Sequence, residues 1–144
     1  MSTVRDLLKK KGNQVWYVSP NDDMLDTLKI MADKGVGALV VVEEGKIKGI
    51  VSERDFARVV SRQERCSLNT TVLEYMTSKV VTVTPDHSIE DCMRLMTNEH
   101  IRHLPVVEGE KLVGIISIGD VVKEVITAKD SKINSLENYI EGRW

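Results

Sequence analysis

Apolar residues follow two different periods along the chain, and each period occurs twice. Spacings of three and four residues predict two amphipathic helices, one containing Met24, Leu25, Leu28 and Met31 and the other Ile89, Cys92, Met93 and Met96. Each predicted helix is followed by a β-rich run (residues 38–42 and 104–107), a turn with Gly45 or Gly109, and a second strand (46–51 and 111–116). A further helix is predicted from Asp55 and from Asp120 onward.

These elements belong to an internal repeat. Residues 15–20 (VWYVSP) reappear as residues 80–85 (VVTVTP), an offset of 80 − 15 = 65, and the same offset holds without a gap through Val60 and Val125. In each copy an extended piece ends at a proline, which cannot donate to a strand ladder. The predicted order is therefore β-α-β-β-α, twice.

The repeat divides the chain into five predicted segments. They are an N-terminal helical lead-in (1–14), repeat 1 (15–60), a polar linker with a short helix (61–79), repeat 2 (80–127) and a C-terminal helical tail (128–144). A copy of about 45 residues is close to the lower limit for folding alone. We therefore expect an α/β (α+β) fold in which the two copies pack with pseudo-two-fold symmetry.

Charge argues against nucleic acid as a partner. The chain has 20 Lys and Arg against 22 Asp and Glu, a net charge of −2, and only 4% aromatic residues. The one basic cluster, Lys9 to Lys11, is expected to be a solvated helix face.

The cysteines and the apolar runs indicate the compartment. Cys66 and Cys92 have no CxxC spacing, which favours a reducing compartment over a structural zinc site. The start of the chain lacks the apolar segment of a signal peptide, and the longest apolar run, residues 36–42, is far shorter than a membrane span. We expect a cytoplasmic protein that does not associate with membranes.

The repeated polar element is Ser-x-x-Asp at the end of the last strand, Ser52 to Asp55 and Ser117 to Asp120. One interpretation is a helix capping box, in which the hydroxyl and the carboxylate each accept a backbone N–H. The other is a ligand site, in which the helix N-terminus faces an anion and the carboxylate accepts both hydroxyls of a ribose. The two are compatible, because the cap can form in the empty protein.

The ordered set of motifs resembles a tandem pair of cystathionine β-synthase (CBS) domains, also called a Bateman module. The motifs are Val-x-x-Val-[ST]-Pro, [VI]-x-x-Leu-[VP]-Val-Val and Gly-Ile-[IV]-Ser-x-x-Asp, each present twice between Val15 and Val125. The segments Ile101 to Pro105 and Leu136 to Ile140 resemble more narrowly the small stand-alone bacterial CBS-pair proteins. The resemblance implies a disk-shaped homodimer that holds adenosine nucleotides in two clefts between the copies.

The resemblance also implies the residues of each cleft. The first cleft would combine Ser52, Arg54 and Asp55 with Thr77, Lys79, Val81, Ile101, Arg102 and His103. The second would combine Ser117, Gly119 and Asp120 with Gln14, Trp16, Val36, Gly37, Ala38 and a shared Arg102. For Trp16, a role as adenine wall and a role as an apolar strand residue are equally open.

The two predicted clefts differ in charge. The first has Arg54, Lys79 and Arg102 for one phosphate, whereas the repeat offset places Gly119, Gln14 and Gly37 at the matching positions of the second. We therefore predict that the Asp55 cleft binds nucleotide more tightly.

The predicted function is a non-enzymatic regulatory sensor of adenosine ligands, with AMP first and ATP, ADP, NAD or S-adenosylmethionine as alternatives. No cofactor is required, a homodimer is expected, and a regulated protein partner is possible. The alternative is a structural dimerisation module with vestigial clefts. Catalysis and metal binding are not expected, since His100 and His103 lack a third ligand in the sequence nearby.

Overall fold

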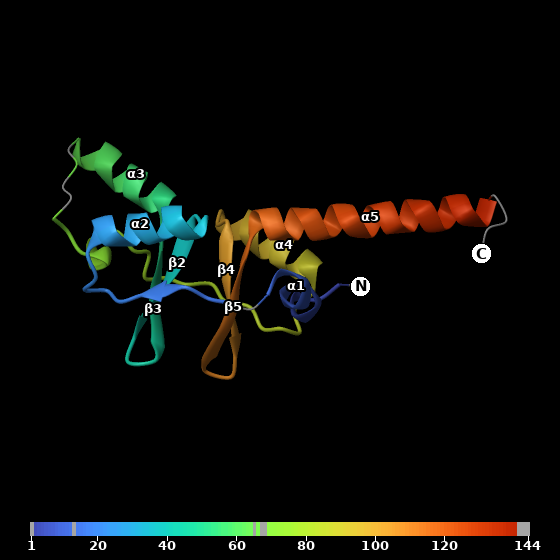
Figure 1. Ribbon diagram of the computed structural model, residues 1–144, viewed down its shortest axis with the longest axis horizontal. Coiled ribbons are helices and arrows are strands. Elements are labelled where there is room, and N and C mark those ends of the chain that lie inside the picture. Colours follow the sequence, from blue (N-terminus) through green and yellow to red (C-terminus); the bar gives the residue numbers. More distant parts are fainter. Residues whose placement is uncertain (1, 13, 65, 67–68, 141–144) are drawn as a thin grey trace. The chain divides into compact units, whose positions relative to one another are not determined.

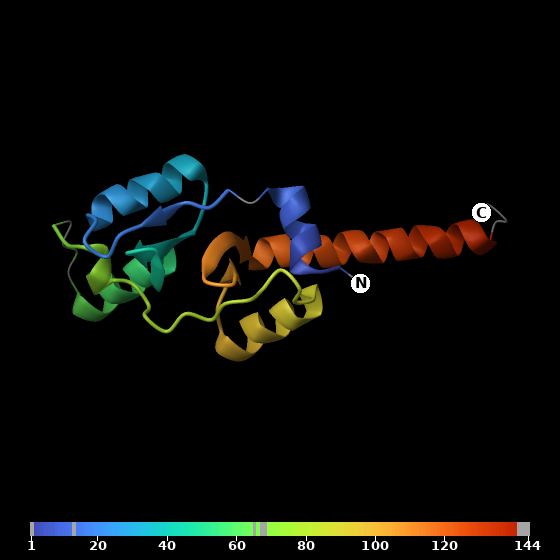
Figure 2. The ribbon, with the colours of Figure 1, turned by 90° about the horizontal axis from the view of Figure 1, so that it is seen from below.

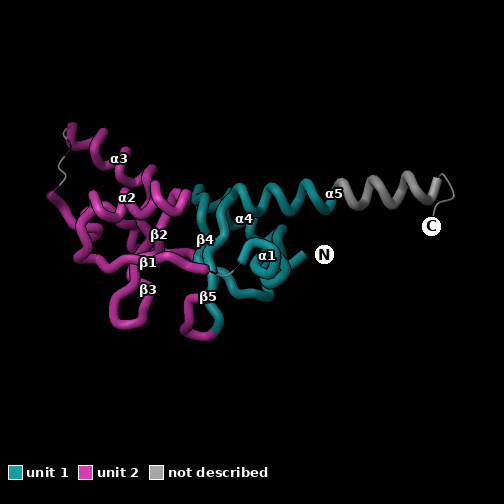
Figure 3. Tube along the Cα trace, viewed as in Figure 1, with its two compact units in different colours: residues 1–13, 82–108, 113–144 teal, residues 14–81, 109–112 magenta. Residues whose placement is uncertain are grey.

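The computed structural model describes residues 2–12, 14–64, 66 and 69–140 (Figure 1). The chain divides into two compact units, coloured separately in Figure 3. Unit 1 comprises residues 1–13, 82–108 and 113–144, and unit 2 comprises residues 14–81 and 109–112. Each unit thus combines most of one repeat with the segment that precedes the other repeat.

Unit 2 is built on a three-stranded sheet. Its elements are β1 (Tyr17–Val18), α2 (Met24–Lys34), β2 (Ala38–Glu43), β3 (Lys46–Ser52), α3 (Glu53–Gln63) and the 3-10 helix η1 (Val72–Glu74). The strand order is β1-β2-β3, with β1 parallel to β2 and β2 antiparallel to β3. Met24 and Met31 of α2 pack with Leu39, Val41 and Val51 of the sheet to form the core.

Unit 1 contains α1 (Val4–Lys11), α4 (Ile89–Glu99), β4 (His103–Glu108), most of β5 (Lys111–Ser117) and α5 (Ile118–Ile140). Strands β4 and β5 form a two-stranded sheet. Helices α1 and α4 both lie against α5 (Figure 2). The buried side chains of this unit include Val4, Ile89, Cys92, Leu104 and Val121.

Local chemistry explains where the helices begin and end. Asp23 caps α2 by accepting the N–H groups of Leu25 and Asp26, and Gly35 ends α2 in the left-handed conformation at φ 65°. In the β2–β3 hairpin, Gly45 adopts φ 77°, which is favourable for glycine.

The predicted β-α-β-β-α order is confirmed in repeat 1, but the first strand of repeat 2 is absent from the described residues. Only Val83 pairs there, donating its N–H to Pro105 O at 3.0 Å and accepting from Val107 N at 2.8 Å. The next hydrogen bond of a parallel pair would require the amide of residue 105, and proline has none.

Two further predictions differ from the structure. Residues 118–140 form one continuous helix, so no break separates the last helix of repeat 2 from the predicted tail, whose residues 141–144 lie outside the described residues. Met93, which the helical spacing places on the apolar face of its helix, is exposed, while Met96 on the same helix is buried.

Candidate functional site

Both Ser-x-x-Asp elements lie where a strand passes directly into a helix. In unit 2, Asp55 Oδ2 accepts from Ser52 Oγ at 2.9 Å and from Ser52 N at 3.1 Å, and Asp55 N donates to Ser52 Oγ at 3.0 Å. In unit 1, Ser117 N donates to Asp120 Oδ2 at 2.8 Å, and Asp120 N donates to Ser117 Oγ at 3.2 Å. The capping interpretation is thus confirmed at both positions.

A capping box alone does not identify a ligand site. Ser88 and Asp91 form the same box at the start of α4, where no ligand is predicted. Burial separates them, since the side chains of Asp55 and Asp120 are 15% and 26% exposed whereas that of Asp91 is 44% exposed. In both Asp55 and Asp120, the capping hydrogen bonds go to Oδ2, and Oδ1 accepts none of them.

A second polar contact repeats at the same junctions. Glu53 N donates to Gly37 O at 3.1 Å in unit 2, and Ile118 N donates to Arg102 O at 2.8 Å in unit 1. The donors and the acceptors are each 65 positions apart, 118 − 53 and 102 − 37. Within their own units, Gly37 therefore lies beside Ser52 and Arg102 lies beside Ser117.

This contact also limits anion binding at the helix N-terminus. In α3, the amide of Glu53 is bonded to Gly37 O and the amide of Asp55 is bonded to Ser52 Oγ. Two of the first three helix amides are therefore already engaged, so a bound anion would depend more on side-chain cations than the sequence suggested.

Thr77 is a linker residue that the structure pairs with the strand leading to Asp55. Its N–H donates to Ile50 O at 2.8 Å and its carbonyl accepts from Ile50 N at 3.0 Å, two residues before Ser52. Lys79 is exposed and Val81 is half-buried in the same unit. Thr77 thus joins the strand end that presents Asp55.

The segments that precede the two repeats dock in equivalent ways, but with a different offset. Val4 N donates to His87 O, and Val72 N donates to Asp22 O, each at 2.9 Å. The acceptors are 87 − 22 = 65 positions apart, whereas the donors are 72 − 4 = 68 positions apart. The N-terminal segment therefore has three more residues between its docked part and its repeat.

The offset of 68 changes which lysines correspond. It pairs Leu8 with Met76, and these side chains lie against the equivalent glycines Gly114 and Gly49. It also pairs Lys11 with Lys79 (11 + 68 = 79), where the repeat offset of 65 pairs Lys79 with Gln14. Lys11 is therefore a cation of unit 1 that the repeat offset does not predict.

Lys11 is bound directly to the predicted ribose carboxylate of unit 1. Its Nζ donates to Asp120 Oδ2 at 2.6 Å and to Ile115 O at 2.7 Å. Burial raises the pKa of Asp120, but the hydrogen bonds from Lys11 and Ser117 and the charge of Lys11 outweigh it and lower the pKa below its usual range.

Lys9, Lys10 and Lys11 are all exposed, as expected of a solvated helix face, but two of them also form ion pairs that the sequence analysis did not predict. Lys10 Nζ lies 3.1 Å from Glu124 Oε1, and Glu124 is nearly buried on α5. Because Lys10 and Lys11 lie on α1 and their partners lie on α5, both ion pairs connect the N-terminal helix to repeat 2. A search for charged partners on the other repeat could have found them.

The remaining predicted residues lie as follows in their own units. Trp16 is half-buried against the core of unit 2, with Lys34 Nζ 4.2 Å from its ring centroid. In the same unit, Val36 is half-buried between α2 and β2. Arg54, in the first turn of α3, is exposed, and so is Gln14. In unit 1, Gly119 is exposed, and Ile101 and His103 are half-buried. Their predicted ligand roles stay predictions.

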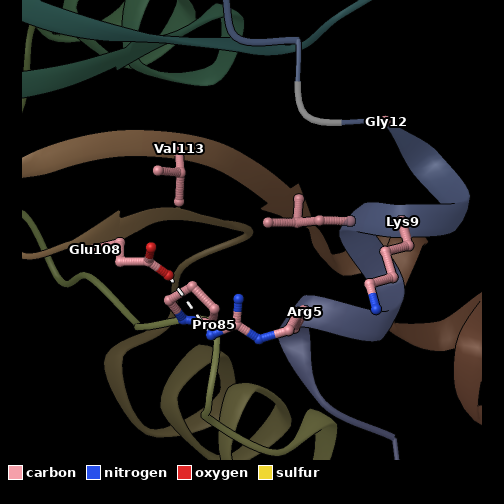
Figure 4. A pocket seen from close by; sticks show the side chains of 7 residues that line it. Arg5, Lys9, Gly12, Pro85, Glu108 and Val113 are labelled. Carbon is pink, nitrogen blue, oxygen red and sulfur yellow. Dashed lines mark ion pairs between the residues drawn. The ribbon is translucent and has the colours of Figure 1, made fainter.

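A pocket of about 410 Å³ lies elsewhere in unit 1 (Figure 4). Its lining residues are Arg5, Leu8, Lys9, Gly12, Pro85, Glu108 and Val113. The Arg5 guanidinium lies 3.3 Å from Asp86 Oδ1 and 3.5 Å from Glu108 Oε2. Because two carboxylates already neutralise Arg5, the pocket offers an anion little net charge, and none of its residues belongs to the predicted clefts.

Among the residues that the structure describes, no three His, Cys, Asp or Glu side chains gather closely enough to hold a metal ion. No helix among them is both long enough and apolar enough to cross a membrane.

Known proteins share both the repeat and the fold. The family model of the CBS domain matches residues 4–62 and again residues 72–127. The CBS domain-containing protein CBSX3, mitochondrial, of Arabidopsis thaliana is 38% identical over 99% of this chain and 74% of its own length.

Two solved structures are similar over most of the chain. A putative signal-transduction protein with CBS domains from Burkholderia ambifaria is 51% identical at a TM-score of 0.82, covering 88% of this chain and 95% of that one. The CBS domain pair of protein MJ0100, in complex with 5′-methylthioadenosine and S-adenosyl-L-methionine, is 25% identical at a TM-score of 0.75 and covers 86% of this chain and 99% of its own. Since the family model matches both repeats, this chain belongs to the CBS domain family and contains two CBS domains in tandem.

Proposed function

We propose that this protein is a non-enzymatic regulatory module that binds adenosine nucleotides, with AMP as the foremost ligand. Asp55 and Asp120 would each accept the hydroxyls of a ribose. The observation that supports this most strongly is the duplicated junction, in which a largely buried carboxylate uses only one oxygen for its cap. ADP, ATP, NAD and S-adenosylmethionine contain the same ribose and adenine and are the other candidates.

A relative supports the ligand class. The MJ0100 domain pair was solved with 5′-methylthioadenosine and S-adenosyl-L-methionine, and both molecules contain adenosine. The likeness of the fold therefore supports an adenosine group as the ligand of this chain. The phosphate preference for AMP rests on the cations of this chain, Arg54, Lys79 and Arg102.

We propose that the Asp55 site is the tighter of the two. Asp55 has no lysine on its carboxylate among the described residues, and its ion pair there is the distant Arg58 of the same helix, at 3.9 Å. Asp120 already holds Lys11 at 2.6 Å. A ribose that binds Asp55 therefore breaks a weaker ion pair than a ribose that binds Asp120.

A thermal-shift panel of AMP, ADP, ATP, NAD and S-adenosylmethionine tests the proposal. A ligand that binds only the folded state raises the melting temperature. We expect AMP to raise it, Asp55→Ala to remove most of the shift, and Asp120→Ala to remove less. Asp91→Ala is the matched control, because it removes the same kind of capping carboxylate from α4 without touching a predicted site.

Three outcomes would contradict parts of the proposal. No shift with any ligand would exclude the sensor function. Loss of AMP binding in Asp120→Ala but not in Asp55→Ala would reverse the ranking of the sites. Release of phosphate from ATP or AMP that is lost in Asp55→Ala would show an enzyme.

A second candidate function is a structural dimerisation module with vestigial clefts, and one surface favours it. Ile118, Val122 and Ile126 are exposed at a spacing of four residues along α5. We propose that this stripe contributes to a homodimer in either case, that a partner protein reads the bound state, and that the protein works in the cytoplasm. A homodimer without any ligand response would favour the structural function.

A further inference from the structure

Lys11 occupies the Asp120 junction as an internal ligand. Its Nζ is held by two acceptors at once, Asp120 Oδ2 at 2.6 Å and Ile115 O at 2.7 Å. The side chains of Lys11 and Asp120 are 34% and 26% exposed, so the pair is partly shielded from water. Both contacts are short and have a charged donor, as in charge-assisted hydrogen bonds, which are about twice as strong as neutral ones.

The equivalent junction of unit 2 is built differently. Ile50, the counterpart of Ile115, gives its carbonyl to the backbone N–H of Thr77 at 2.8 Å. Lys79, the counterpart of Lys11 by the docking offset, is exposed, and the structure gives no ion pair between it and Asp55 within the described ranges. The two predicted ribose carboxylates therefore differ, because Asp120 is bound to an ammonium and, among the described residues, Asp55 is not.

Displacing Lys11 has a cost that depends on the charge of the ligand. A ribose offers Asp120 neutral hydroxyl donors in exchange for an ammonium, which on its own is an unfavourable exchange. A ligand that also has a phosphate gives the released ammonium a new anion. The flexible four-carbon stem of lysine allows such a change of partner without movement of α1.

We propose that Lys11 determines the ligand specificity of the Asp120 site, admitting adenosine ligands that bring a 5′-phosphate and excluding uncharged nucleosides. This inference rests on the proposed function and deepens it for one site. The repeat offset places no cations at the Asp120 site, but Lys11 makes this site the more selective of the two for a phosphate. The Asp55 site has no such internal competitor and accepts either class on the strength of its own contacts.

The test compares AMP with adenosine at one site. Asp55→Ala removes the other site, and isothermal titration then measures the affinity ratio of AMP to adenosine in this background. Adding Lys11→Met, which keeps an unbranched apolar side chain but removes the ammonium, is expected to strengthen adenosine binding and weaken AMP binding, so that the ratio falls by about tenfold or more. Lys11→Arg retains the charge and is expected to preserve the preference for AMP.

Lys10→Met is the matched control. Lys10 lies on the same helix and also pairs with an α5 carboxylate, that of Glu124, but not with Asp120. It therefore removes one charge and one helix-to-helix ion pair without touching the site, and the affinity ratio should not change. Circular dichroism of each variant verifies that α1 and α5 are folded.

The outcomes separate the inference from the function on which it rests. An unchanged ratio in Lys11→Met, together with AMP binding that Asp120→Ala abolishes, would overturn the role of Lys11 alone. Absence of binding in the Asp55→Ala background, with binding intact in the original protein, would also overturn it, because Asp120 would then hold no ligand. Absence of binding in every variant and in the original protein would overturn the proposed function as well.

Discussion

A Cβ atom on Gly49 would lie 2.7 Å from the carbonyl oxygen of Thr77. Gly49 is in β3, and the Thr77 backbone is paired with the next residue of that strand, Ile50. The absent side chain thus allows the linker to lie against the strand that leads to Asp55. Gly49→Ala is expected to lower the free energy of unfolding by about 2 kcal/mol, because a backbone segment has to shift. Urea unfolding measures this loss.

Gly114 is the matched control for that substitution. A Cβ there would lie 2.8 Å from Cδ2 of Leu8, the far end of a flexible side chain, instead of a backbone atom. Gly114→Ala is therefore expected to cost less than about 1 kcal/mol. Equal costs at the two positions would contradict the view that Thr77 is fixed by close backbone contact.

The ion pair between Lys11 and Asp120 predicts a pH-dependent contribution to stability. The pKa of Asp120 is lowered in the folded protein, so the pair stabilises the fold above the usual carboxyl range and this contribution is lost as the pH falls through the folded pKa. Lys11→Met is expected to lower the unfolding free energy by about 1 kcal/mol at neutral pH. The difference from the original protein should shrink as the pH falls below the usual carboxyl range and through the lowered pKa of Asp120.

Urea unfolding at several pH values measures that difference. Asp120→Asn combined with Lys11→Met provides the double-mutant cycle, and the coupling between the two substitutions should vanish in acid. A difference that stays constant from neutral to acidic pH would show that Lys11 stabilises the fold through packing instead of charge.

Much of the fold follows from the sequence because its signals are local and duplicated. The spacing of Met24 and Met31 predicts α2, and the glycine at position 45 predicts the hairpin turn, as the structure confirms. The strand expected at residues 80–83 fails because it depends on a partner, Pro105, which lies far away in the sequence. Pairing between distant segments is the part of the fold that periodicity does not report.

The candidate site shows the same division. Ser52 and Asp55 are identified by their spacing, and the cap they form is confirmed. Lys11 is missed because an ungapped offset of 65 applies only within the repeats, while the segments that precede them dock with an offset of 68. Because three additional residues precede repeat 1, the repeat offset does not align Lys11 with Lys79, and the contact of Lys11 with Asp120 is not predicted.

The two cysteines should differ sharply in reactivity. Burial, followed by the charge of Asp91, raises the pKa of the Cys92 thiol to about 11, and its side chain is fully buried on α4. Cys66 is exposed. Iodoacetamide at mildly alkaline pH should therefore modify one thiol in the native protein and both in urea. Mass spectrometry counts the modified residues, and rapid modification of Cys92 in the native state would mean that α4 opens readily.

The exposed stripe on α5 predicts the effect of a charge on self-association. Val122 lies between Ile118 and Ile126, so Val122→Glu would place a carboxylate in the middle of a buried interface if two copies meet there. We expect the original protein to have twice the chain mass of 16.2 kDa in light scattering, and the variant to have the mass of one chain. Thr127→Glu adds the same charge on an exposed position beside the stripe and should leave the mass unchanged. A dimeric Val122→Glu would move the interface away from α5, because an unpaired buried carboxylate costs several kcal/mol, on the order of the whole free energy of a weak dimer.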